Sequence, residues 1–527
     1  MPQSDGHPVN RWVFVLVRPW PRPNDWAVVL NLETEGFFHV LPVQPASGRG
    51  AARATAAFAA LAFLMAHPAR ADTLHAGREA PAPTWAHDVA PILMDHCVEC
   101  HRPGSVAPFS LLGYKDAAKR ARFIAKTVTS RIMPPWSPDG PTGAFVDERR
   151  LTDVEISTLG RWAESGAAPG DLSRAPAPPP APDGGWRLGP PDLVVRMRRP
   201  FTIPAGPGDT YEVLPIPFSL DKVPADVVAR ARIPDTDLIA VAAVEVRPGN
   251  QKVLHHAAVF IDTSGAARKR EAAEGGNGYA SFGTPGFVPA AYLGGRVPGT
   301  TPRFLPSGIA AGVMPMSGDV VLQIHYHATG RLETDQTEVG IYLMREPTVR
   351  MVDSLFLRSF KLDIPAGDPA FAVEDSIVIP ADCVLMSVFP HMHLLGREVH
   401  ASAQMPDGTT RRLVDISRWS FRWQDHYSYR EPFLLPKGTR VRCRWVFDNS
   451  AANPSNPNSP PLDVRFGPNS TDEMCGLLLG VLPVNLDDIP VLLDARIRKM
   501  KESVAELTPE QRSRFKWDDA FDDLAGK

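Results

Sequence analysis

The sequence predicts a multidomain protein in which a small all-α domain precedes an all-β region in sandwich form. The chain has 527 residues, too many for one hydrophobic core, so two or three domains are expected. Stretches with helical periodicity are few outside Ala86–Gly166 and the C-terminal tail. Beyond Trp186 the pattern changes to short alternating runs separated by turn residues, and 55 prolines suit short strands joined by turns.

The charge balance is nearly even, with 56 lysines and arginines against 59 aspartates and glutamates. The formal charge of -3 gives no reason to expect nucleic acid or an anionic membrane surface as a partner. The body of the chain lacks a run of about 18 apolar residues, so no transmembrane anchor is expected in the mature protein.

The N-terminal region, residues 1–71, has the organisation of a leader. Arg49 and Arg53 precede the small, apolar stretch Ala54–Ala66, and Ala69-Arg70-Ala71 follows it. This is the order of a secretory signal peptide, with cleavage expected after Ala71 and a periplasmic or secreted mature chain. Residues 1–48 lie upstream of the signal, and we expect them to come from a misplaced translation start; the alternative is a long genuine leader.

The first chemical motif is the C-x-x-C-H run Cys97-Val98-Glu99-Cys100-His101. Two thiols on one helical turn can each add to a vinyl group of haem, and His101 is then held under the iron as proximal ligand. The alternatives are a chance match or a zinc or redox pair. Export of the chain and the helical stretch Trp85–Asp95 before the motif favour covalent c-type haem.

A ligand for the opposite face of the haem is available at Met133. A predicted helix, Lys115–Ser130, delivers this residue, and Pro134 and Pro135 end the helix at once. A thioether opposite histidine raises the haem potential and suits a one-electron carrier. A capping box, Thr152-Asp153-Val154-Glu155, opens the next helix, Val154–Ser165.

Residues 84–170 resemble a small class I cytochrome c domain over their whole length, in the order helix, CxxCH, helix, Met, helix. The proline-rich residues 171–189 that follow are typical of a stiff linker.

Six histidines beyond Trp186 form three close pairs in strand-like segments. In a strand, residues two apart lie on one face, so His391 and His393 provide half of a transition-metal site. The adjacent residues His255 and His256 need a bulge or a strand end to converge on one ion. The alternative is that these histidines are ordinary core or surface residues. The expected strands are Leu238–Val246, Val253–Ile261, Val320–His327, Val384–Phe389 and Thr439–Phe447.

The order of these motifs resembles the type II copper, ascorbate-dependent monooxygenases, which include peptidylglycine α-hydroxylating monooxygenase and dopamine β-monooxygenase. The resemblance covers roughly Pro190–Asn485. It implies a first copper held by His255, His256 and His325, and a second held by His391, His393 and Met474, the last within Asp472-Glu473-Met474-Cys475. It also implies a Cys443–Cys475 disulfide with Cys383 left free. His327 matches no family ligand and is expected to be a polar sandwich residue, and His400 and His426 are expected to be structural.

The fold that this resemblance implies is a pair of jelly-roll sandwiches, with one copper on each, facing a cleft. We expect them at residues 190–357 and 358–485, with a boundary near Ser354–Leu362 and a helical tail at 486–527.

The family reaction is hydroxylation of a C–H bond by O2, with two electrons normally given by ascorbate. Here the fused haem, or another redox protein, suggests a different or additional donor to the His255/His256/His325 copper. The positions that hold the substrate carboxylate in peptide-processing members are Phe389, Gly476 and Leu478, so a small neutral or apolar organic substrate is expected. The alternative function is a periplasmic haem–copper electron-transfer or copper-binding protein without oxygenation.

Overall fold

The computed structural model describes residues 81–514, except 104, 106, 181–184, 207, 298–300 and 349. The chain divides into two compact units, Met1–Arg78 and Glu79–Lys527, and every described residue lies in the second. The expected leader, its signal peptide and the last residues of the expected tail therefore fall outside the described residues. Within the described part of the chain, none of the helices combines the length and the apolar character needed to span a bilayer.

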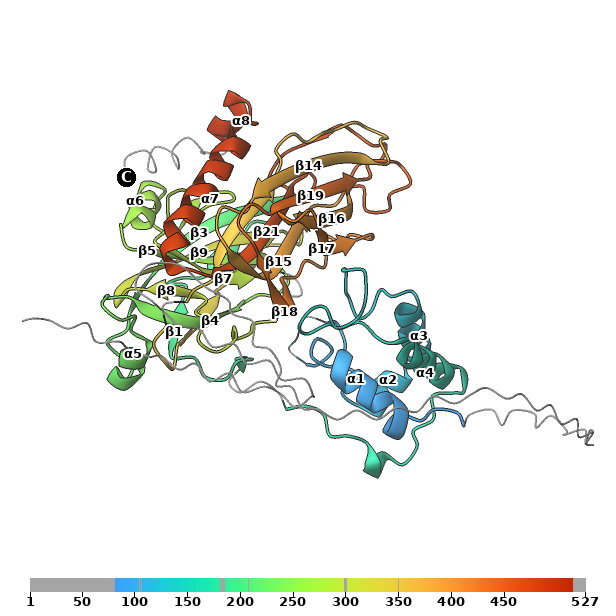
Figure 1. The fold of residues 1–527 in the computed structure, drawn as a ribbon. Helices are drawn as coiled ribbons and strands as arrows, with labels where there is room; N and C mark the ends of the chain where they lie inside the picture. The colour runs from blue at the N-terminus through green and yellow to red at the C-terminus, as the bar shows by residue number, and fades with distance from the viewer. Residues whose placement is uncertain are drawn as a thin grey trace, which may run out of the picture. The chain divides into compact units, whose positions relative to one another are not determined.

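The segment after Thr84 is helical, as expected (Figure 1). Its elements are a π-helical turn η1 (Trp85–Val89), α1 (Ala90–His96), α2 (Tyr114–Ala118), α3 (Ala121–Thr129) and α4 (Asp153–Glu164). They share one core, which includes Trp85, Leu93, Ile124, Leu159 and Trp162.

Two local predictions for this segment have different outcomes. The single helix expected over Lys115–Ser130 is instead two helices, because the chain turns at Arg120, whose backbone leaves the helical region at φ -115° and ψ 9°. The capping box is confirmed: Thr152 Oγ1 accepts from Glu155 N at 3.2 Å, and Glu155 Oε2 accepts from Thr152 N at 2.7 Å. The following residues include a 3-10 turn η2 (Leu172–Arg174).

The rest of the described chain is mostly β, with several sheets and few helices. A first pair of sheets has the strand orders β6-β3-β9-β5-β7 and β1-β11-β4-β8. Side chains from both sheets, such as Val259 and Ile341, belong to one core, so the sheets pack face to face. The strands are β1 (Leu193–Arg196), β3 (Asp209–Ser219), β4 (Ile239–Arg247), β5 (Leu254–Asp262), β6 (Tyr279–Ala280), β7 (Ala291–Arg296), β8 (Gly312–Met314), β9 (Ser317–His327) and β11 (Glu338–Leu343).

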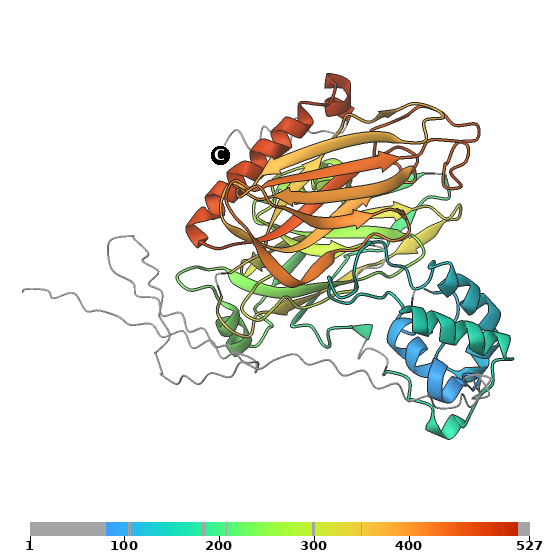
Figure 2. The ribbon, with the colours of Figure 1, turned by 45° about the vertical axis from the view of Figure 1, so that its right-hand side comes forward.

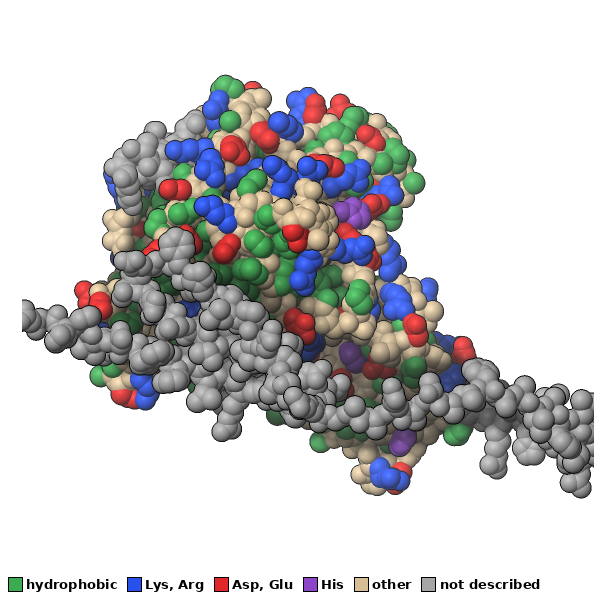
Figure 3. Space-filling model, viewed as in Figure 1, with side chains coloured by type: hydrophobic (Ala, Val, Ile, Leu, Met, Phe, Trp, Pro, Cys, Tyr) green, Lys and Arg blue, Asp and Glu red, His purple; other side chains and the backbone are tan. Residues whose placement is uncertain are grey.

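Smaller elements accompany this first sandwich. They are the two-stranded sheet of β2 (Phe201–Ile203) and β10 (Glu333–Asp335), and the helices α5 (Ala225–Ala231) and α6 (Ala266–Ala273). On the face drawn in Figure 3, lysine and arginine side chains are interspersed with aspartate and glutamate, as the even charge balance leads one to expect.

A second pair of sheets has the orders β12-β21-β15-β18 and β14-β19-β16-β17, with β13 and β20 paired separately. Their shared core includes Leu385, Trp445 and Leu479. The strands are β12 (Asp353–Arg358), β13 (Asp363–Ile364), β14 (Phe371–Val378), β15 (Cys383–Met392), β16 (Gly396–Gln404), β17 (Thr410–Ile416), β18 (Tyr427–Leu435), β19 (Arg440–Phe447), β20 (Val464–Arg465) and β21 (Cys475–Pro483).

The C-terminal helix α7 (Ile489–Val504) follows a 3-10 turn η4 (Leu486–Asp488) and packs on this second sandwich, as expected of the tail (Figure 2). Its residues Leu492 and Val504 belong to the same core. A short helix, α8 (Pro509–Arg514), comes next.

The expected boundary between the sandwiches is wrong by a few residues, because it cuts through β12. This strand pairs along its whole length with β21, from Asp353 opposite Val481 to Arg358 opposite Gly476. Antiparallel pairing of this extent makes β12 the first strand of the second sandwich.

The residues between Met133 and α4 are an addition to the second sandwich that the sequence did not predict. Val146 N donates to Ser428 O at 2.8 Å, and Arg430 N donates to Ala144 O at 3.0 Å. Between these bonds Phe145, only 5% exposed, enters the core of the second sandwich, with its ring centroid 5.1 Å from that of Tyr429. The segment that follows the predicted haem ligand is therefore anchored in the β region.

We predict that Phe145→Ala lowers the free energy of unfolding of the second sandwich by about 3–5 kcal/mol, because it leaves a cavity in that core. The measurement is denaturant unfolding followed by tryptophan fluorescence. Phe123→Ala is the matched control: Phe123 lies in the same N-terminal segment but is 56% exposed. It is expected to change the free energy by less than about 0.5 kcal/mol. Equal effects of the two substitutions would contradict the anchoring role.

Candidate metal centres

The first histidine set lies on two neighbouring strands of the first sandwich, β5 and β9. The register between them shifts, with Leu254 opposite Tyr326 and His256 opposite His325, so His255 is the extra residue of a β-bulge. The bulge lets adjacent side chains converge, as the sequence required. His256 Nδ1 lies 3.2 Å from His255 Nδ1 and 3.3 Å from His325 Nδ1. The candidate ligand atoms of the three rings all lie within 4.8 Å of one another.

Burial keeps the rings of His255 and His256 uncharged. Burial, reinforced by the neighbouring imidazole of His325, lowers the pKa of His255 to about 3 and places that of His256 well below its usual value. The Nδ1 atoms of these rings are close enough to hydrogen-bond one another in suitable tautomers or to share one cation. Imidazole nitrogens are good ligands for copper and zinc, so the donor chemistry fits a transition metal.

A buried carboxylate orients His325 from the side away from the set. Asp209 Oδ2 lies 3.4 Å from His325 Nε2, and Asp209 Oδ1 lies 2.7 Å from His327 Nδ1. Burial raises the pKa of Asp209, but hydrogen bonds from His325 and His327 outweigh it and hold that pKa well below the usual range. A carboxylate on the far nitrogen of a metal-binding histidine is a common orienting device. His327 is thus an outer partner rather than a member of the set, in line with the prediction.

The second histidine set lies at the end of β15 in the second sandwich. The rings of His391 and His393 meet edge to face, with centroids 5.2 Å apart. His391 Nδ1 lies 2.6 Å from Gln424 Oε1, and His393 Nδ1 lies 3.2 Å from Asp472 O. Because both partners are acceptors, each Nδ1 carries its proton and each Nε2 keeps a free lone pair. Gln424 Nε2 donates to Phe421 O at 3.0 Å, which fixes the orientation of the amide.

Electrostatics of the second set follow the same rule as those of the first. Burial lowers the pKa of His391 to about 4, although the bond to Gln424 raises it, and places the pKa of His393 well below its usual value. Both rings are therefore neutral donors at physiological pH.

Met474 lies one residue before β21, the strand that pairs with β15. In their register His391 lies opposite Gly476 and Met392 opposite Cys475, where the pairing ends. Met474 is partly buried and packs against the core of the second sandwich, and its ligation stays a prediction.

Glu473, to which the sequence analysis assigned no role, holds this end of the strands together. Its fully buried carboxylate accepts from the backbone N–H groups of His393 at 2.5 Å, Met474 at 3.0 Å and Leu395 at 2.9 Å. Burial raises the pKa of Glu473 to about 8, against the lowering effect of these bonds.

One phenyl ring, that of Phe421, lies between the two sets. Its centroid is 4.9 Å from that of His255, in a stacked arrangement, and 5.8 Å from that of His393, edge to face. Phe421 and Gln424 belong to a loop between β17 and β18, so strand periodicity could not reveal them. The only available signal was the density of aromatic residues in Trp419-Ser420-Phe421-Arg422-Trp423.

The CxxCH residues form one turn at the end of α1. Cys97 N donates to Leu93 O at 2.9 Å, and His101 N donates to Cys97 O at 2.9 Å, which keeps both cysteines and the histidine on one side of the chain. His101 Nδ1 lies 3.1 Å from Phe109 O, so its Nε2 is left to bind a metal. Burial raises the pKa of Cys97 to about 12. Met133 follows α3 and is 40% exposed, and its ligation stays a prediction.

The expected disulfide is not formed in the structure, where Cys443 and Cys475 are both buried, free thiols. The Cys475 thiol instead donates to Ser359 O at 3.3 Å. The two cysteines are nonetheless neighbours, since burial and then Cys475 raise the pKa of Cys443 well above its usual value. Cys383 is also a free, buried thiol.

The positions that lack the family's carboxylate anchors form an apolar surface beside His391. Phe389 lies opposite Leu478 in the strand register and stacks on His426, with centroids 5.9 Å apart. His400 lies elsewhere, between Asp415 at 3.1 Å and Glu398 at 3.2 Å. Both histidines outside the pairs are thus engaged by neighbouring side chains.

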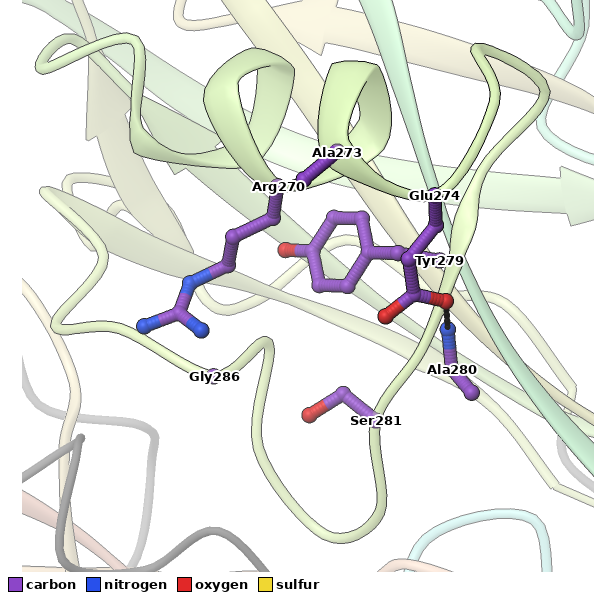
Figure 4. Close-up of a pocket in the computed structure, with 7 residues that line it drawn as sticks. All are labelled: Arg270, Ala273, Glu274, Tyr279, Ala280, Ser281 and Gly286. Carbon is purple, nitrogen blue, oxygen red and sulfur yellow. Dashed lines mark hydrogen bonds between the residues drawn. The ribbon is translucent and has the colours of Figure 1, made fainter.

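A cavity of about 200 Å³ is separate from both sets, since no histidine lines it (Figure 4). Its wall is formed by α6 and the loop after it, and Ala280 N donates to Glu274 Oε2 at 3.1 Å across one side. The lining residues are Arg270, Ala273, Glu274, Tyr279, Ala280, Ser281 and Gly286.

We predict that His256→Ala removes one bound copper per chain from the copper-loaded protein, because it removes the central nitrogen of the first set. The measurement is elemental analysis after desalting. His400→Ala, which removes a histidine paired with carboxylates, should leave the copper content unchanged. Equal copper in the wild type and in His256→Ala would contradict the assignment of the first set.

Comparisons with known proteins found no matching family model and no matching curated protein. Three solved structures are similar in part. PNGF-II has 11% identity, over 55% of this chain and 61% of that chain, with a TM-score of 0.19. The CBM22-1-CBM22-2 tandem domain of Paenibacillus barcinonensis Xyn10C has 9% identity, over 51% and 83%, with a TM-score of 0.13. The β-porphyranase BpGH86A of Bacteroides plebeius has 10% identity, over 52% and 35%, with a TM-score of 0.15. The chain thus spans less than two thirds of PNGF-II and of BpGH86A, and similarities this weak carry no argument about fold or function.

Proposed function

We propose that this protein is an exported oxidoreductase with one covalent haem c and two coppers, which hydroxylates a C–H bond of a small neutral or apolar substrate with O2. The observation that carries the proposal is the difference between the two donor sets. One offers three imidazole nitrogens, and the other offers two imidazole nitrogens, to which the family resemblance adds the Met474 thioether. The type II copper monooxygenases combine these two sets.

The donors decide which task suits each set. Three imidazoles accommodate both copper oxidation states, which suits electron transfer, whereas two imidazoles and a soft thioether favour Cu(I) and leave a coordination position open. When bound, copper at the second set would supply the oxygen-activating centre, and copper at the first set would supply the second electron. Ascorbate or a redox protein would be the donor of electrons.

The chain's own residues perform the positioning. Gln424 and the Asp472 carbonyl hold the Nδ1 protons of His391 and His393, so both Nε2 lone pairs are left free for a metal. Glu473 fixes the backbone from which His393 and Met474 project. Phe421 excludes water from the contact between the two sets, where a polar side chain would admit it.

The substrate follows from the side chains beside His391. Phe389 and the largely buried Leu478 offer no hydrogen-bonding group for a carboxylate. A neutral or apolar molecule gives up little hydration free energy on contact with these residues, whereas a charged peptide terminus would lose its hydration without compensation.

The two-jelly-roll architecture and the class I cytochrome c assignment of residues 84–170 belong to this proposal.

The haem assignment is supported by the turn at the end of α1. Cys97 and Cys100 would hold the haem covalently, His101 would bind the iron through Nε2, and Met133 is the expected ligand on the opposite face. The haem would supply a one-electron store.

We predict that oxygen uptake by the protein loaded with haem and copper, with ascorbate or reduced cytochrome as donor, falls to the copper-free background on Met474→Ala. The reason is that the second set loses its only soft ligand. Met500→Ala is the matched control, because Met500 is also a partly buried methionine packed against the same core. It should keep the wild-type rate. Full copper loading with oxygen uptake that does not depend on Met474 would favour the electron-transfer function instead.

A further inference from the structure

One arginine joins the CxxCH turn to the β region. Arg149 precedes α4, and its side chain is only 12% exposed. Its guanidinium lies 3.5 Å from the carboxylate of Glu99, a residue inside the CxxCH motif, and it also hydrogen-bonds Thr301 of the first sandwich. The same Glu99 pairs with Arg187 at 2.5 Å, and the Arg149 charge lies close enough to the Cys100 thiol to lower its pKa against the larger raising effect of burial. The motif is thus connected to a buried network rather than to solvent alone.

The far side of Arg149 lies on the loop that carries Phe421 and Gln424. Its guanidinium carbon lies 5.0 Å from the ring centroid of Trp423, a cation–π contact with a side chain that is 7% exposed. Trp423 is the residue before Gln424 in the chain. Arg149 therefore contacts the CxxCH motif on one side and the 418–425 loop on the other.

Side chains of the 418–425 loop contact both histidine sets. Gln424 bonds to His391 Nδ1 at 2.6 Å, and Phe421 stands between His255 and His393. A continuous series of contacts therefore leads from Cys100 and Glu99 through Arg149 and Trp423 to Gln424 and then to His391. The other contact described above, at Phe145, leads into the hydrophobic core and not to a histidine.

We propose that the Arg149–Trp423 contact is the junction through which electrons pass from the CxxCH segment to the histidine sets. This inference rests on the haem and copper assignments of the proposed function but not on oxygenation. In each transfer one electron leaves ferrous haem, which becomes ferric, and reduces one Cu(II) to Cu(I), and no bond forms or breaks. Ascorbate or a reduced cytochrome, each a one-electron donor here, reduces the haem again.

Two physical features suit this role. Electron tunnelling is slowed most by gaps that the electron must cross through space, and buried contacts at van der Waals or hydrogen-bond distance keep those gaps short. The Arg149 guanidinium contacts the Glu99 carboxylate with one edge and the ring of Trp423 through its central carbon, so one side chain bridges the two. The series of contacts through Arg149, Trp423 and Gln424 reaches His391 first. The sequence, in which a CxxCH domain is fused to the β region, had suggested the His255/His256/His325 set as the electron acceptor.

The test is anaerobic photoreduction of the haem in the full chain loaded with haem and Cu(II). The loss of the ferrous haem absorption band then reports transfer to copper within the molecule. Trp423→Leu, which removes the ring but keeps apolar bulk, is expected to slow this loss several-fold. Trp423→Phe, which restores an aromatic ring, should recover much of the rate.

Trp186→Leu is the matched control. Trp186 is also 7% exposed and also lies against an arginine, with the carbon of the Arg247 guanidinium 4.3 Å from its ring centroid. Arg247 in turn pairs with Glu338 of β11. This variant should keep the wild-type rate. Equal rates in Trp423→Leu and Trp186→Leu would overturn the proposal.

The Cu(II) electron paramagnetic resonance spectrum distinguishes a lost route from a lost site. It should be the same in Trp423→Leu as in the wild type. If Trp423→Leu changes the Cu(II) spectrum, Arg149→Gln is the second test. Slower loss of the ferrous haem band with an unchanged copper spectrum in Arg149→Gln supports the Arg149–Trp423 junction, and loss at the wild-type rate refutes it. Because neither oxygen nor substrate is present, this result is independent of whether the protein is a monooxygenase.

Discussion

The burial of neutral histidine rings is the constraint on which the account of this protein depends. A buried ring nitrogen needs a partner, because an unsatisfied polar atom away from water is costly. At His391 and His393 the Nδ1 atoms have partners in Gln424 and the Asp472 carbonyl. At the first set the Nδ1 atom of His256 lies 3.2 Å from that of His255 and 3.3 Å from that of His325, and the proposed copper would be their shared partner. The two sets therefore present different nitrogens to a metal, for reasons that lie in their surroundings.

Strand features were largely accessible from the sequence. Alternation located the strands that became β4, β5, β9, β15 and β19, and the adjacent pair His255-His256 required the bulge that the β5–β9 register contains. The capping box before α4 is equally local. Predictions that depended on which distant segments pair with one another were less accurate. The expected domain boundary cut through β12, which pairs with β21, and the disulfide implied by the resemblance is not formed.

Residues that position the sites could not be predicted, because they act across large distances in the sequence. Gln424 meets His391 from a loop, Glu473 binds backbone groups of another strand, and Arg149 reaches Trp423 from the N-terminal segment. None of these contacts leaves a periodic pattern. The contacts of one loop with both sets of candidate ligands form only when both sandwiches are folded. The consequence for function is that one short segment, 418–425, influences both candidate metal centres together.

The most direct measurement is a crystal structure of the copper-loaded protein with anomalous diffraction recorded at the copper absorption edge. The account predicts two peaks per chain, one among the Nδ1 atoms of His255, His256 and His325 and one beside the Nε2 atoms of His391 and His393, with Phe421 between them. A single peak per chain, or copper bound only at sites outside the two histidine sets, would contradict it.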